Sequence, residues 1–179
     1  MFIFAVELTR GQAVPLFCTR HICQMNIIEI KDAIEKEIVA RKMFFVDIRI
    51  SADNEVTLTL EKEEGSVSLD DCVAVSELFE AAFDREKEDY SLTVSSAGLD
   101  QPFKVQGQFT KALGTRVEAW IKGGRKLIAT LEAADGQQVT LHYTALEKAE
   151  GSKKKVKVVK HEVVPMEQVV SVRPYIEIN

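Results

Sequence analysis

Hydrophobic residues in the first part of the chain recur at helical spacing and then at strand spacing. Between Asn26 and Arg41 the isoleucines stand three or four residues apart, with charged residues between them: Ile27, Ile30, Ile34 and Ile38. This period predicts an amphipathic helix over residues 26–41. Residues 1–24 show no sustained period, so we expect them to form a mobile or adventitious extension, with Met25 as the effective start of the fold.

Two alternating segments follow on either side of the turn sequence Ala52-Asp53-Asn54. The first, residues 44–51, places four hydrophobic side chains on one face of a strand: Phe44, Val46, Ile48 and Ile50. The second, residues 56–61, alternates apolar with polar positions, and its apolar residues are Val56, Leu58 and Leu60. Together the two segments predict a β-hairpin with one buried face.

A second helix and a third strand complete this module. Ser68 has the side chain of an N-cap, and the acidic residues Asp70 and Asp71 follow in the first turn, where the helix dipole favours them. The inner stripe of this helix is expected to contain Cys72, Val75, Phe79, Ala82 and Phe83. Residues 90–94 predict the third strand. The order αββαβ predicts an α+β module in which two helices cover one face of a small sheet.

After Pro102 the helical periods stop. Short alternating segments remain at residues 115–121, 127–133, 138–143, 156–163 and 169–178, with Gly-containing hairpin connections between several of them. Five short strands are best closed into a small all-β barrel, because closure removes exposed edges. We therefore expect an α/β domain over residues 25–101 and a barrel domain over residues 102–179.

The distribution of charge supports this division. The 179 residues carry 23 Lys and Arg against 28 Asp and Glu, which argues against a generally basic nucleic-acid coat. Residues 1–102 contain 20 acidic and 10 basic residues, whereas residues 103–179 contain 8 acidic and 13 basic ones. Such an asymmetry indicates two modules with different partners or a polar ligand surface, and the simpler alternative is two solvated faces that differ by chance.

Cysteine usage and hydropathy indicate the compartment. Three cysteines, an odd number, do not form an obvious disulfide framework, and the apolar N-terminus is interrupted by Glu7 and lacks a cationic region typical of a signal peptide. No apolar run is long enough to cross a membrane. We expect a cytoplasmic protein with no membrane partner.

The sequence offers little for catalysis or metal binding. Cys18, His21 and Cys23 are soft ligands close together, but no second pair with ligand spacing exists, and His142 and His161 are isolated in the sequence. Ser95 and Ser96 precede Gly98 without forming a G-x-S-x-G elbow, and no phosphate-binding or dinucleotide-binding fingerprint is present. We expect no enzyme activity, no metal and no cofactor.

Clustered cations in the second module suggest contact with RNA. They are Lys122, Arg125 and Lys126 around the Gly-Gly turn, and Lys153, Lys154, Lys155, Lys157 and Lys160 on a later hairpin arm. Lys and Arg at barrel tips can neutralise phosphates and give salt-dependent binding. Aromatic residues are sparse here, with Trp120 and Tyr143 the nearby candidates, so base stacking has little support. The alternative is that charged hairpins only keep the edges of the sheet hydrated.

The most specific stretch of the chain is Tyr90-Ser-Leu-Thr-Val-Ser-Ser-Ala-Gly-Leu-Asp-Gln-Pro-Phe103. It resembles the signature of the bacterial ribosome maturation factor RimP family, in which a strand ends in Ser-Ser-Pro-Gly-Leu-Asp-Arg-Pro-Leu. The matching positions are Ser95, Ser96, Gly98, Leu99, Asp100 and Pro102. Residues 67–72 also resemble the family's entry into its second helix. The resemblance implies an α/β module followed by an SH3- or Sm-like barrel.

The signature departs from the family at Ala97, Gln101 and Phe103, where the family has Pro, Arg and Leu. Loss of the arginine affects any ion pair or phosphate contact at that position. In physical terms Gly98 can adopt a positive φ and Asp100 can accept hydrogen bonds from local backbone amides. Pro102 then stiffens the exit, so this interdomain segment either fixes the angle between the modules or forms a contact surface.

The resemblance implies a non-enzymatic assembly factor, a monomer that binds the immature small (30S) ribosomal subunit. The acidic first module, with Asp70 and Asp71, would then face a basic small-subunit ribosomal protein, while Asp100 belongs to that surface or to the hinge. Ribosomal RNA would contact the basic hairpins through Lys122, Arg125, Lys126, Lys153, Lys154 and Lys155. Two alternatives stay open: an Sm-like regulator that binds messenger or small RNA, and a pure protein adaptor.

Overall fold

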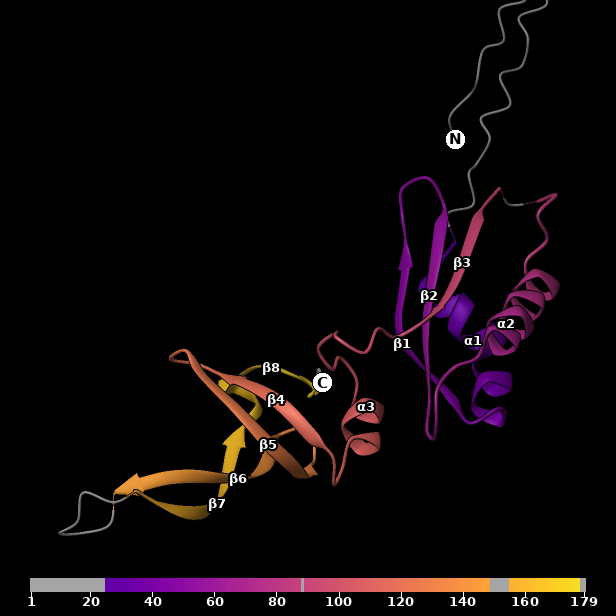
Figure 1. Cartoon of the computed structure of the whole chain (residues 1–179). Helices are drawn as coiled ribbons and strands as arrows, with labels where there is room; N and C mark the ends of the chain where they lie inside the picture. Colours follow the sequence, from indigo (N-terminus) through magenta and orange to yellow (C-terminus); the bar gives the residue numbers. More distant parts are fainter. Residues whose placement is uncertain (1–24, 88, 149–154, 178–179) are drawn as a thin grey trace, which may run out of the picture.

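The computed structural model describes residues 25–87, 89–148 and 155–177, and Figure 1 shows them arranged around two separate sheets. The first module contains α1 (Ile27–Ala40), β1 (Met43–Ile50), β2 (Glu55–Lys62), α2 (Leu69–Ala82) and β3 (Ser91–Ser96). The predicted αββαβ order is therefore confirmed, and the expected extension over residues 1–24 lies outside the described residues. Among the described helices, none is both long and apolar enough to span a bilayer.

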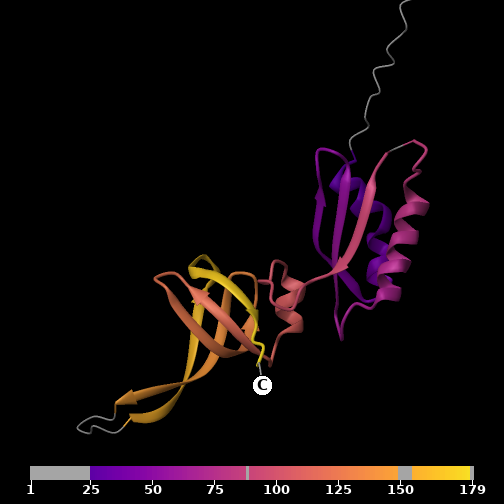
Figure 2. The same cartoon turned by 45° about the horizontal axis from the view of Figure 1, so that its top comes forward.

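The sheet of the first module has the order β1-β2-β3. Strands β1 and β2 form an antiparallel hairpin, and α2 connects β2 to β3, which pair in parallel. Both helices cover the same face of this sheet (Figure 2). Its other face carries the polar alternate residues of β2, since Val56, Leu58 and Leu60 are buried under the helices, as predicted.

Both helices begin where the sequence predicts. Asn26 caps α1 by accepting a 3.0 Å hydrogen bond from the Ile28 amide, and Ile30, Ile34 and Ile38 are buried along one stripe. Ser68 and the third residue of α2, Asp71, form a capping box in which each side chain accepts the other residue's backbone amide. The predicted N-cap at Ser68 is confirmed.

Phe79 is at the centre of the first core. Its ring is fully buried, 4.7 Å from the Phe83 ring and 5.3 Å from the Tyr90 ring, and the Tyr90 hydroxyl donates to the Phe83 carbonyl oxygen at 2.9 Å. This cluster connects α2 to the start of β3. Of the predicted inner stripe, Ala82 is exposed, because the helix ends there and turns away from the sheet.

A register shift in β1 corrects the predicted strand face. The pairing with β2 is interrupted between Phe45 and Asp47, so one extra residue is inserted there. Phe45, Ile48 and Ile50 pack against the core, whereas Phe44 and Val46 are not part of it, although Val46 is itself buried. The expectation that Phe44 and Val46 share a face with Ile48 was wrong because the bulge exchanges the two faces of the strand.

The second sheet contains five antiparallel strands in the order β7-β6-β5-β4-β8. They are β4 (Arg116–Ile121), β5 (Arg125–Ala134), β6 (Gln138–Lys148), β7 (Lys155–Pro165) and β8 (Val169–Pro174), with a 3-10 turn, η1 (Met166–Gln168), before the last. The five predicted strands are confirmed. Among the described residues no ladder joins β7 to β8, so the predicted closure into a barrel is not confirmed by the hydrogen bonding.

A short helix, α3 (Gln106–Lys111), lies between Pro102 and the first predicted strand of the second module, which was expected to contain no helix. That expectation was wrong, because six residues are too few to display a helical period. Phe109 of α3 is buried in the second core, and its ring lies 5.2 Å from the ring of Phe103. The backbone amide of Phe103 donates a hydrogen bond to the carbonyl oxygen of Val172 in β8. Figure 1 shows α3 between the two sheets, so the helix belongs to the second core and faces the first module.

Polar contacts fasten α3 to the first module. Glu61 of β2 accepts hydrogen bonds from the Lys111 ammonium and the Gln108 amide, both at 2.9 Å. Lys111 also donates to the Gly65 carbonyl oxygen at 2.6 Å. A Cβ on Gly107 would stand 2.8 Å from the Phe44 ring, which shows how closely the backbone of α3 approaches β1. Glu61 therefore makes two of the polar contacts between the modules.

We expect Glu61→Ala to weaken docking of the two modules by about 1–3 kcal/mol, because one substitution removes two hydrogen bonds, one of them to a charged donor. Small-angle scattering would then report a larger radius of gyration and a broader distance distribution. Glu63→Ala is the matched control, since Glu63 is exposed on the same segment and makes no side-chain contact with the described residues. An unchanged scattering profile for Glu61→Ala would contradict this role.

Candidate functional site

The signature segment lies at the end of β3, where the chain leaves the first sheet. The Ala97 amide donates to the Leu60 carbonyl oxygen at 2.9 Å, and the Gln101 amide donates to that of Gly98 at 3.1 Å, which closes a tight turn. Gly98 has no positive φ, so the expected use of its conformational freedom was wrong. Position 98 favours glycine because there is little room for a side chain: a Cβ there would stand 3.0 Å from Asp100 Oδ1 and from Gln101 Cγ.

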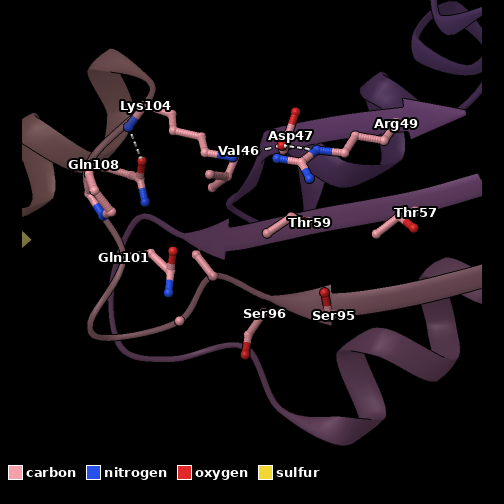
Figure 3. Close-up of a pocket in the computed structure, with 13 residues that line it drawn as sticks. Val46, Asp47, Arg49, Thr57, Thr59, Ser95, Ser96, Gln101, Lys104 and Gln108 are labelled. Atoms are coloured by element: carbon pink, nitrogen blue, oxygen red, sulfur yellow. Dashed lines mark hydrogen bonds and ion pairs between the residues drawn. The ribbon is translucent and has the colours of Figure 1, made fainter.

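The other signature residues have different surroundings. Asp100 accepts a 3.2 Å hydrogen bond from the side-chain amide of Gln101, and no backbone amide of the described residues donates to it, contrary to the expectation. Leu99 is exposed, with 76% of its surface accessible. Ser95, Ser96 and Pro102 line a cleft between β1, β2, the signature segment and the start of α3 (Figure 3). The signature is thus partly a turn and partly the wall of a cleft.

This cleft has a volume of about 220 Å³, below the roughly 300 Å³ and more of pockets that enclose drug-sized ligands. Most of the residues that line it have polar side chains. The lining residues are Val46, Asp47, Arg49, Thr57, Thr59, Ser95, Ser96, Ala97, Gly98, Gln101, Pro102, Lys104 and Gln108. The cleft suits a small polar group and not a bulky apolar one.

Asp47 organises the charges of the cleft. Its Oδ2 atom accepts from Lys104 Nζ at 2.7 Å and from Arg49 Nε at 2.8 Å (Figure 3). The hydrogen bond from Lys104 is the main reason why the pKa of Asp47 lies below its usual value, and Arg49 adds to the effect. Arg49 and Asp47 come from β1, whereas Lys104 comes from the segment before α3, so this carboxylate holds cations from both sides of the boundary.

The sequence did not identify Asp47, Arg49 or Lys104 as site residues. Asp47 and Arg49 stand two positions apart in β1, and this alternation could have placed them together on the polar face of the sheet. Lys104 directly follows the signature but meets Asp47 only through the docking of α3. No local pattern encodes that contact.

The acidic pair at the start of α2 has two different roles. Asp71 Oδ2 accepts from the Ser68 amide and forms a 2.7 Å ion pair with Lys62, and the hydrogen bond from Lys62 is the largest cause that lowers the pKa of Asp71. Asp70 is exposed and has no side-chain partner among the residues described. The protein-facing role of the pair stays a prediction, and Asp70 is the carboxylate available for it.

The predicted RNA-facing cations lie around the hairpin between β4 and β5. Arg125 forms two hydrogen bonds to the Glu162 carboxylate, at 2.8 and 3.1 Å, and the pKa of Arg125 is raised by this partner. Lys126 pairs with Glu118 at 2.9 Å. Lys122 lies in the turn beside Gly123 and makes no ion pair with the described residues. The positive charge of Arg125 and Lys126 is therefore partly compensated within the protein.

The hairpin arm that carries the other lysines is only partly described. Lys153 and Lys154 lie outside the described residues, and of Lys155 the structure describes the backbone at the start of β7 but not the side chain. In Figure 1 the paired part of this arm, β6 with β7, extends away from the rest of the second sheet. The RNA-facing role of these lysines stays a prediction.

Two histidines that are isolated in the sequence meet in the structure. His142 and His161 are directly opposed on β6 and β7, with their rings stacked at 4.7 Å, and their Nδ1 atoms lie 3.6 and 2.9 Å from the Glu132 carboxylate. In the part of the chain that the structure describes, no cluster of three His, Cys, Asp or Glu residues is arranged to hold a metal ion. Cys18, His21 and Cys23 lie outside that part.

Comparison with known proteins agrees with the signature. The RimP N-terminal domain model matches residues 33–100. A relative named ribosome maturation factor RimP from Christiangramia forsetii is 34% identical over 131 residues, which cover 73% of this chain and 84% of the relative. A relative with the same name from Flavobacterium psychrophilum is 33% identical over 122 residues, which cover 67% of this chain and 77% of the relative. Another, from Porphyromonas gingivalis, is 32% identical over 112 residues, which cover 63% of this chain and 73% of the relative. The chain belongs to the RimP family of ribosome maturation factors.

Proposed function

We propose that this protein is a non-enzymatic assembly factor of the cytoplasm that acts as a monomer on the immature small (30S) ribosomal subunit. Membership of the RimP family carries this proposal, because the relatives are named for ribosome maturation. The opposite charges of the two modules support contacts of two kinds, with a basic ribosomal protein and with ribosomal RNA. The proposal needs no cofactor.

We further propose that residues 25–101 and 102–179 are two domains joined at the signature segment. Their buried residues form two separate clusters, one around Phe79 and one around Leu131 and Leu141. We propose that the second is an SH3- or Sm-like barrel whose β7–β8 seam is filled by side chains, since Val164 of β7 and Val172 of β8 are buried in the same cluster. The signature and α3 would then set the angle between the domains.

Sedimentation of a bacterial lysate through sucrose gradients at two salt concentrations tests the function. We expect the protein to be enriched on free small subunits and absent from translating ribosomes, and we expect this enrichment to fall as salt rises. Recovery at the top of the gradient with small RNA bound would instead support an Sm-like regulator. Recovery there without RNA or subunits would support a protein adaptor.

Lys122→Glu tests the predicted RNA-facing surface. We expect weaker association with the subunit and a salt slope lower by about 1 for the lost phosphate contact. Reversing Lys153, Lys154 and Lys155 to Glu together should have a larger effect of the same kind. Lys87→Glu is the control for net charge, since Lys87 is exposed on the first module and, among the described residues, pairs with Asp84 alone. If the reversals behave like Lys87→Glu, the basic hairpins do not contact RNA.

A further inference from the structure

The cleft between the modules contains hydrogen-bond donors without partners. Thr57 and Thr59 of β2 and Ser95 of β3 place three hydroxyl groups along its wall, whereas the side chain of Ser96 points to the other side of β3 (Figure 3). Thr59 and Ser95 are directly paired in the β2–β3 ladder, so their hydroxyls are neighbours on the open face of the sheet. Within the described part of the chain, none of these three hydroxyls makes a hydrogen bond. They are available to a ligand.

The charged groups of the cleft leave one net positive charge. Arg49 and Lys104 are its cations and Asp47 its one carboxylate. Arg49 uses only its Nε atom for Asp47, so both terminal amino groups of the guanidinium are free to donate. A planar fork of donors beside several hydroxyls suits a ligand that only accepts hydrogen bonds and carries negative charge.

Size and charge together indicate which anion fits. The volume of about 220 Å³ has room for a phosphate and the sugar atoms attached to it. A phosphodiester carries a single negative charge, which matches the net charge of the cleft, whereas a phosphate monoester at neutral pH carries nearly two. A carboxylate has two acceptor oxygens, whereas a phosphodiester adds two ester oxygens, which are weaker acceptors, to its two charged ones.

We propose that this cleft binds one phosphodiester group of an RNA chain. Arg49 and Lys104 contact the phosphate oxygens, and the Thr59 and Ser95 hydroxyls donate to the remaining acceptors. This rests on the proposed function, which brings the protein to ribosomal RNA, and it adds a contact on the acidic module, far from the basic hairpins. It also gives Ser95, the first serine of the signature's Ser-Ser pair, a role in binding beyond its position near the end of β3.

Binding of a short fluorescent single-stranded oligoribonucleotide to the full chain, followed by anisotropy, tests this site. We expect Arg49→Gln to weaken binding about tenfold, because it removes charged hydrogen bonds, and to lower the salt slope by about 1. Thr59→Val, which keeps the shape and removes the hydroxyl, should weaken binding less. Arg85→Gln is the control, since Arg85 pairs with Glu80 on α2, outside the cleft. Equal affinities for Arg49→Gln and Arg85→Gln would overturn the proposal.

Two further experiments distinguish RNA from free phosphate as the ligand, and distinguish failure of this site from failure of the proposed function. Inorganic phosphate should compete with the oligoribonucleotide only at far higher concentration, and equal potency would make the cleft a free-phosphate site and overturn the RNA assignment. Gradient sedimentation of the wild-type chain reports the proposed function independently. Association with subunits together with an oligoribonucleotide affinity unaffected by Arg49→Gln would leave the function standing and reject the site. Loss of oligoribonucleotide affinity in Arg49→Gln, without any subunit association of the wild type, would support the site and reject the function.

Discussion

Phe79→Ala is expected to lower the free energy of unfolding of the first module by about 3–5 kcal/mol, the largest effect of any single substitution considered. The Phe79 ring is fully buried between Phe83 and Tyr90, so its removal takes away hydrophobic burial and leaves a cavity. Urea unfolding followed by far-ultraviolet circular dichroism measures the loss. Val73→Ala is the control on the same helix, because 50% of the Val73 surface is exposed.

The same variant tests whether the modules fold separately. Trp120 is the one tryptophan of the chain and lies in β4, so its fluorescence reports the second module alone. We expect the fluorescence transition to keep its wild-type midpoint in Phe79→Ala while the dichroism transition moves to lower urea. A tryptophan midpoint that moves by the same amount would mean that the two cores unfold as one unit, and the proposed domain division would then be wrong.

Glu118→Gln is expected to destabilise the second module by about 1–3 kcal/mol at neutral pH. Glu118 is buried in β4, and its carboxylate accepts from Lys126 at 2.9 Å, from Trp120 Nε1 at 2.8 Å and from Arg173 at 2.6 Å. The two cations are partly exposed, which keeps the expected loss below that of a fully buried ion pair. Urea unfolding followed by Trp120 fluorescence measures it.

The effect should depend on pH in a defined direction. The hydrogen bonds from Lys126 and then Trp120 are the largest causes that lower the pKa of Glu118, to about 2 from an ordinary value of 4.5. Because the pKa is lower in the folded state, the stabilisation is present above pH 4.5 and is lost as the pH falls from there towards 2. The difference in free energy of unfolding between the wild type and Glu118→Gln should therefore shrink as the pH falls from 4.5 towards 2.

A control and a contrary result define this test. Glu167→Gln alters an exposed carboxylate in η1 that has no side-chain partner among the described residues, so its stability should follow the wild type at every pH. A difference between wild type and Glu118→Gln that stays constant down to about pH 2 would contradict the role of the Glu118 carboxylate charge.

The elements that the sequence predicted correctly are those with a repeating local signal. The isoleucine period of α1 and the alternation of β2 each contain several residues in phase, and Ser68 with Asp71 forms a cap within one turn. The bulge of β1 and the six residues of α3 have no such repetition. The bulge depends on a single inserted residue, and α3 depends on the burial of Phe109 in the second core, so the sequence predicted neither.

The contrast between local and distant signals also explains which parts of the candidate site the sequence could predict. The signature could be identified because its residues are contiguous, whereas the cleft needs Asp47 and Lys104, which stand 57 residues apart. The cations predicted to face RNA were chosen by charge alone. The pairing of Arg125 with Glu162, which stands 37 residues further along the chain, has no local signal in the sequence. Charge clusters in a sequence therefore overstate free positive charge when cross-strand carboxylates are present.

The sharing of Asp47 Oδ2 between the two modules has a consequence for how the molecule responds to its partners. Any anion that draws Lys104 away from Asp47 also removes a contact between the modules, so occupancy of the cleft and the angle between the modules are thermodynamically linked. Linkage is reciprocal: a partner that holds the modules at one angle must change the affinity of the cleft for its anion by the same factor. A single partner that contacts both modules would therefore also regulate the cleft.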